Sequence, residues 1–136
     1  MSYAGFIAEM KAALVAAGFT ETPDPRISSL SEAPRGNFDK SFLVVPESAP
    51  TPDLELSIAP QFFRGGLRLE VGAAFDSEAS SEKVNAITYA QDVTEALAFV
   101  TFNHGRILTL DPPSIERDDT DKRVVWAWSF LARWSR

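Results

Sequence analysis

Residue types with catalytic potential are sparse in this chain of 136 residues. His104 is the only histidine, and it stands beside Gly105 at the end of an expected helix, so we interpret it as a residue that caps helix carbonyls or faces water. No serine can be matched with a histidine and an acid, and no G-x-S-x-G, P-loop or H-E-x-x-H pattern occurs. The sequence therefore predicts a protein that is not an enzyme.

A cluster of carboxylates, Asp118, Asp119 and Asp121, has the oxygen chemistry that divalent cations prefer. It lacks the spaced ligands, the turn glycine and the terminal glutamate of a calcium loop. The pair Glu70 and Asp76 has no signature that separates acid–base catalysis from ordinary surface charge. We therefore expect a solvated acidic turn and predict no metal and no cofactor.

Basic residues accompany an aromatic in one part of the chain, where Arg64, Arg68 and Arg106 join Phe63. This grouping falls short of a nucleic-acid platform, which combines a basic groove with several stacking aromatics. The net charge of −6 also argues against a surface that grips phosphates. It does not exclude a surface past which DNA must slide, and we predict no specific nucleic-acid binding.

Length and composition describe a folded protein with one domain, residues 1–136, and 45% hydrophobic residues. There is no cysteine, so disulfides and thiolate metal sites are excluded. The N-terminus lacks the pattern of a signal peptide, and no apolar run approaches the roughly 20 residues of a membrane span. We expect a soluble protein of the cytoplasm with no membrane partner.

The chain is organised around an expected β-hairpin formed by residues 54–64 and 67–76. Both runs alternate apolar and polar residues, and Gly65-Gly66 suits a two-residue type I′ turn between them. That turn places Ile58 opposite Ala73 and puts both apolar sets on one face. Pro60, which donates no ladder hydrogen bond, makes the first run an edge strand.

Two helices are expected. The first covers residues 2–17 and ends at Gly18-Phe19, which suits a C-terminal glycine cap. The second begins at Ser80 or Ser81 and extends to residue 103. Its apolar stripe should lie across the hairpin, and it consists of Ile87, Ala90, Val93, Leu97 and Val100.

Residues 20–40 show no periodicity and contain several prolines, so we expect an irregular connection that orders only when a partner binds. Ile27 and Phe38 suggest that parts of it dock on another surface. Residues 41–46 read as a short apolar strand in the middle of a sheet, and prolines then mark a stiff linker. Residues 106–110 are a further strand, followed by an acidic polar loop that reaches Lys122.

The last strand, residues 123–134, is largely apolar on both faces. It is therefore either central in the sheet with cover on both sides or in contact with another subunit. The overall order, α-β-β-β-α-β-β, predicts an α+β domain with a mainly antiparallel sheet of about five strands and two helices on one face. One face of the last strand carries Val124, Trp126, Trp128, Phe130, Ala132 and Trp134.

With this order, the chain resembles the tail terminator, or tail completion, proteins of long-tailed phages, the lambda type among them. The shared features are the first helix with its Gly-Phe end, the irregular connection into the run F-D-K-S-F-L-V-V-P (38–46), and the strand R-L-E-V (68–71). A long helix, an acidic loop and a final aromatic strand that ends in A-R-W (132–134) complete the resemblance.

The resemblance implies a structural virion protein that forms a homo-oligomeric ring, a hexamer, on the last ring of the tail tube. Such a ring stops tail polymerisation and presents a surface to the head-side neck or connector protein. The expected location is the virion tail, after assembly in the host cytoplasm. Two alternatives stay open, a neck or head-closure protein of the same particle and a small α+β ligand-binding domain.

The residues expected at subunit or partner interfaces are aromatic or basic, because interface cores favour aromatic residues and arginine. The connection 20–40, the expected hairpin and the last strand supply them. They are Phe38, Phe63, Arg64, Arg68, Trp126 and Trp134.

Overall fold

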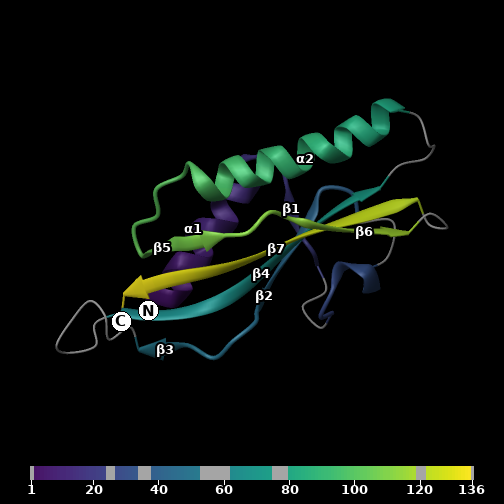
Figure 1. The fold of residues 1–136 in the computed structure, drawn as a ribbon. Helices are drawn as coiled ribbons and strands as arrows, with labels where there is room; N and C mark the ends of the chain where they lie inside the picture. Colours follow the sequence, from purple (N-terminus) through teal and green to yellow (C-terminus); the bar gives the residue numbers. More distant parts are fainter. Residues whose placement is uncertain are drawn as a thin grey trace.

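The computed structural model describes residues 2–23, 27–33, 38–52, 62–74, 80–118 and 122–135. Over these residues the chain forms two α-helices and a mixed sheet of seven strands (Figure 1). The α+β class expected from the sequence is confirmed, whereas the strand count and the strand order differ from the expected ones. None of the described helices is long and apolar enough to cross a membrane.

The sheet is built around two strands of 13 residues, β4 (Phe62–Ala74) and β7 (Arg123–Ser135), which pair antiparallel along their full lengths. The strand order is β1-β2-β4-β7-β5, and β3 and β6 lie beside the long pair on opposite sides. Only the contact between β1 and β2 is parallel. The shorter strands are β1 (Thr20–Glu21), β2 (Ser41–Pro46), β3 (Thr51–Pro52), β5 (Gly105–Leu110) and β6 (Ser114–Asp118).

Helix α1 (Ser2–Ala16) ends as the sequence predicts. Gly18 has a φ of 98°. Its N–H donates to the carbonyl of Val15, and the N–H of Phe19 donates to that of Leu14. This pair of bonds is the Schellman motif, in which a glycine takes the left-handed conformation that other residues avoid.

Both helices pack on the same face of the sheet, as expected. Helix α2 (Ser80–Ala98) ends earlier than the expected residue 103, and Gly105, next to that expected end, begins β5. The outer members of its expected stripe are wrong, because Ile87 is 61% exposed and Val100 lies beyond the helix and is 43% exposed. The main core contains Phe6, Met10 and Leu14 from α1, Ala90, Val93 and Leu97 from α2, and Leu67, Leu69, Val71, Trp128 and Phe130 from the sheet.

The expected turn at Gly65-Gly66 is wrong, because β4 runs straight through both glycines. Neither has a positive φ; among the described glycines only Gly18 has one. The pair serves close packing instead, since a Cβ on Gly65 would lie 3.0 Å from the Trp134 ring. Ala73 pairs with Val124, and its expected partner Ile58 lies outside the described residues together with the rest of 53–61.

The opposite face of the sheet carries a second, smaller core. The 3₁₀ turn η1 (Leu30–Glu32) packs there, and Leu30 and Phe38 are fully buried. The connection 20–40, expected to dock elsewhere, thus docks its described parts on the sheet of its own chain.

Two further expectations are corrected. Strand β2 is not central, because only the two-residue β1 flanks its outer side. The acidic loop before Lys122 contains β6, which pairs with β7. Hydrophobic periodicity does not predict strand β6, because Ile115 is its only apolar residue and is itself 45% exposed.

Candidate functional site

The two edges of the sheet differ in how they are protected. Along the β2–β3 edge stand Pro46, Pro50 and Pro52, with β1 covering the start of β2. On the other side, Pro112 and Pro113 separate β5 from β6, and β5 itself contains no proline. Proline and short covering strands are the usual protection of sheet edges. Strand β5 is therefore an edge of six residues without proline, interrupted by an irregularity between Ile107 and Thr109.

Hydrogen bonds at both ends of β5 show which backbone groups face outward. Ser135 N donates to His104 O, and Asp111 N donates to Ser129 O. In an antiparallel pair, residues whose backbone N–H and C=O bond the neighbouring strand alternate with residues whose groups point away from it. Counting from the two bonds above, Arg106 and Thr109 direct their backbone groups toward β7. The backbone groups of Gly105, Ile107 and Leu110 then point to the open side, with an irregularity at Leu108 between them. A further strand could pair with these groups.

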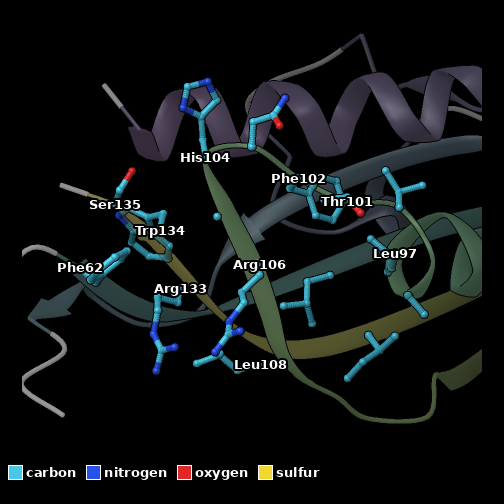
Figure 2. A pocket seen from close by; sticks show the side chains of 16 residues that line it. Phe62, Leu97, Thr101, Phe102, His104, Arg106, Leu108, Arg133, Trp134 and Ser135 are labelled. Carbon is cyan, nitrogen blue, oxygen red and sulfur yellow. The ribbon is translucent and has the colours of Figure 1, made fainter. Parts of the chain in front are cut away.

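A groove of about 820 Å³ runs along this edge, between β5 and the chain that leaves α2 (Figure 2). Its apolar wall toward α2 includes Leu97 and Phe102, Leu108 lies beside Arg106 and Arg133, and Trp134 lies at one end. Next to this wall Phe99 is 82% exposed, the largest exposed fraction among the exposed large hydrophobic residues of the described chain. Apolar surface of this kind beside an open strand marks an interaction site.

The sheet face opposite the helices carries a row of arginines at the same end. Arg64 is the cross-strand partner of Arg133, and Arg133 is the partner of Arg106, so β4, β7 and β5 each contribute one. Directly opposed residues project to the same face. Arg106 is exposed, while Arg133 is 9% exposed and, like Arg64, has a further interaction within the chain. The row gives an acidic chain a local surface suited to carboxylates.

The start of β5 is held in place by Glu9 of α1. Its carboxylate accepts the backbone N–H of Asn103 at 2.6 Å and that of His104 at 2.8 Å. The hydrogen bond from Asn103 is the largest cause that lowers the pKa of Glu9 below its ordinary value; desolvation opposes it, and the hydrogen bond and charge of His104 lower the pKa further. His104 itself is exposed and does not cap α2. Glu9 therefore orders the loop that forms one wall of the groove.

The structure brings together only some of the residues expected at interfaces. Phe63, Arg64 and Trp134 lie at the same end of the sheet, where Phe63 and Trp134 are cross-strand partners on the helix-covered face and Arg64 lies on the opposite face. Arg68 lies farther along the arginine face, with its Nε 3.2 Å from Glu70.

The two remaining expected residues lie elsewhere. Phe38 is fully buried in the second core. Trp126 lies near the far end of β7, paired with Ile115, and its indole N–H has no hydrogen-bond partner within the described structure. Both sit apart from the groove, so neither contributes to the candidate site.

Sequence reasoning missed Arg133 and the open edge itself. In the sequence, Arg133 is only one polar position in an apolar strand. Its neighbours in the arginine row, Arg64 and Arg106, come from strands whose pairing with β7 the sequence does not specify. Within the described ranges, no group of three or more His, Cys, Asp or Glu residues could hold a metal ion. The acidic residues 119–121 lie outside those ranges.

The chain matches no family model and no curated protein.

Proposed function

We propose that this protein is a structural virion component, a tail terminator that forms a homo-oligomeric ring, a hexamer, on the end of a phage-like tail tube. The observation that carries the proposal is the site at β5, where an open strand edge, an apolar groove and an arginine row adjoin. Such a surface suits a protein partner. The resemblance of the sequence to tail terminators supplies the particular role.

Symmetry supports a ring. A tail tube has cyclic symmetry, so a cap that contacts every tube subunit equivalently should share that symmetry. Ring closure requires head-to-tail contacts, in which one surface of each copy meets a different surface of the next. The two sheet edges differ in this way, since one is open and the other carries prolines. The net charge of −6 also suits a conduit that DNA passes without adhering.

The test has two parts. Native mass spectrometry of the purified protein, alone and mixed with isolated tail tubes, should show a closed oligomer of fixed size and binding to tube ends. Deletion of the gene should leave tails that are overlong or fail to join heads. Infectious tails of normal length in the deletion would refute the terminator role, and normal tails attached to leaking heads would favour the neck alternative.

The groove also favours a second candidate, a small ligand-binding domain, because its volume of about 820 Å³ lies in the range of ligand pockets. Its polar groups, chiefly Arg106 and Arg133, would select an anionic ligand. A thermal-shift screen with small carboxylates and phosphates tests this. Stabilisation that Arg106→Ala abolishes would support it, and a flat screen would eliminate it.

A further inference from the structure

Strand β6 continues the edge that β5 begins. Strand β4 occupies one side of β7 along its whole length, so β5 and β6 lie one after the other on the other side (Figure 1). Ser129 directs its backbone groups to this side, and so do the β7 residues two and four positions before it. Their partners Ser114 and Glu116 therefore bond β7, whereas Ile115 and Arg117 direct their backbone groups to the open side.

The outward positions of β5 and β6 fit those of a second copy placed in the reverse direction. Two residues that exchange backbone hydrogen bonds in an antiparallel pair must both direct their groups toward the other strand. Ile107 of one copy and Ile115 of the second copy meet this condition, and Gly105 then lies opposite Arg117 of the second copy. The register is symmetric, so β6 of the first copy pairs with β5 of the second copy in the same way.

The apolar side chains match in this register. Ile107 and Ile115 both project to the helix-covered face, because their partners on β7, Ala132 and Trp126, belong to the main core or pack against it. Ile115 is 45% exposed in the single chain. Pairing would place it directly opposite Ile107 of the second copy, and opposed β-branched side chains stabilise a sheet.

The charges match on the opposite face. Arg106 of one copy lies opposite Glu116 of the second copy, at a position where the side chains of paired strands approach most closely. Both residues are exposed, and neither makes a hydrogen bond or an ion pair with the described part of its own chain. Opposite charges placed directly across a strand pair stabilise it.

Neighbouring registers lose these matches. A shift of two residues in one direction places Ile107 opposite Pro113, which has no N–H to donate, and Arg106 opposite Ser114. A shift of two in the other direction places Ile107 opposite Arg117. A shift of one residue opposes outward groups to inward groups and forms no ladder.

We propose that two copies of this chain associate edge to edge, with β5 of each paired antiparallel to β6 of the other about a twofold axis near Asp111. Pro112 and Pro113 then lie near the axis, between the two paired stretches, where no backbone N–H is required. The inference goes beyond the proposed function and does not rest on it. It concerns the protein before it meets a tail, and a ring would form after these edges separate.

The absence of native cysteine allows a direct test by disulfide cross-linking. Within one chain Arg106 and Glu116 are about 27 Å apart, because their partners on β7, Arg133 and Val125, are eight residues apart. Across the contact their Cβ atoms lie at disulfide distance. A mixture of the Arg106→Cys protein and the Glu116→Cys protein should therefore form a covalent dimer under mild oxidation.

The single variants are the matched controls. Neither should cross-link to itself, because identical positions lie on opposite sides of the twofold axis. The chain with both substitutions should stop at the dimer. No disulfide in the mixture, equal cross-linking of a single variant, or a ladder beyond the dimer overturns the inference.

Charge exchange tests the polar half of the contact. Arg106→Glu or Glu116→Arg alone should weaken dimerisation at least about tenfold, because like charges then oppose each other twice in the dimer. The chain with both substitutions should regain the native dissociation constant within about threefold, as measured by analytical ultracentrifugation. Glu95→Arg on α2 is the control for net charge and should alter it less than about twofold. A double variant no tighter than the single ones overturns the inference.

Native mass spectrometry with tail tubes separates this inference from the proposed function. A free dimer that still forms rings on tube ends supports both. A free dimer that never binds tube ends supports the inference and refutes the proposed function. A free chain that stays monomeric at the concentrations used for NMR overturns the inference, whatever it does on tubes.

Discussion

Glu70 and Ser29 are 41 residues apart in sequence, yet the carboxylate of Glu70 accepts the hydroxyl hydrogen of Ser29 at 2.8 Å. The same oxygen accepts the N–H of Leu30 at 3.2 Å, and the other lies 3.2 Å from Arg68 Nε. Glu70 is 1% exposed. A single buried side chain therefore fastens η1 to the sheet and balances its own charge with an arginine.

Glu70→Ala should destabilise the fold by about 3 kcal/mol, because removing the carboxylate leaves buried donors without their acceptor. Chemical denaturation measures the change. Hydrogen exchange of the Leu30 amide should accelerate more than that of amides in β4. Glu32→Ala, which removes an exposed carboxylate from the same turn, is the control and should cost less than about 1 kcal/mol.

The fastening by Glu70 also illustrates what the sequence could not specify. The presence of two helices, the Gly18 cap and the alternation of β7 follow from local patterns, and the structure agrees with them, although α2 ends earlier than expected. The role of Glu70 depends on a contact 40 residues away, and no local pattern distinguishes a buried acid from a surface one. The turn predicted at Gly65-Gly66 was wrong for a related reason. A glycine pair suits a turn and a close packing site equally well, and only the position of Trp134 decides between them.

The candidate site shows the same division. Sequence alone suggested Phe63, Arg64 and Trp134, because aromatic and basic residues suit interfaces, and the structure places all three at one end of the sheet. The open edge and the arginine row arise from strand order, which requires knowing that β5 follows β7 in the sheet. Residue types thus indicated candidates, while long-range pairing assembled the surface.

Gly72 packs closely against Phe38 of the second core, and a substitution there tests how much that close packing stabilises the fold. A Cβ at this position would lie 2.6 Å from the carbonyl oxygen of Phe38 and 3.0 Å from its ring. Gly72→Ala should therefore destabilise the protein by about 1–3 kcal/mol, because backbone must shift to admit the methyl group. Gly66→Ala is the matched control in the same strand, since its nearest contact is the Ser48 side chain at 3.3 Å. Equal costs in urea denaturation would contradict the packing explanation.

Tyr89 should titrate unusually late. Burial, the charge of Asp39 and the hydrogen bond from the Tyr89 hydroxyl to Asp39 raise the pKa of Tyr89 to about 12. A raised folded-state pKa contributes stability that is present below pH 10 and is lost as the pH rises through 12. Absorbance titration in a Tyr3→Phe background, where Tyr89 is the sole tyrosine, measures it. Asp39→Asn should lower the pKa, and an unchanged titration would exclude Asp39 as a cause.

Glu9 supplies the last prediction, which concerns the groove itself. Its lowered pKa means that the stability it contributes is present above the ordinary value of 4.5 and is lost as the pH falls through the folded-state pKa. Protonation weakens the two bonds to Asn103 and His104, so the wall of the groove should loosen in acid. Hydrogen exchange of these two amides, corrected for the intrinsic rate, should accelerate in acid relative to amides in β4.

Glu9→Gln should reproduce that acceleration at neutral pH, since the neutral amide offers one acceptor oxygen where the carboxylate offers two. Glu95→Gln is the matched control, because Glu95 is an exposed carboxylate on the other helix, bonded to Gln91. It should leave both amides unchanged. Should Glu9→Gln also leave them protected, the loop would be held by its packing and not by the carboxylate. In that case acid would have no route to the groove through Glu9.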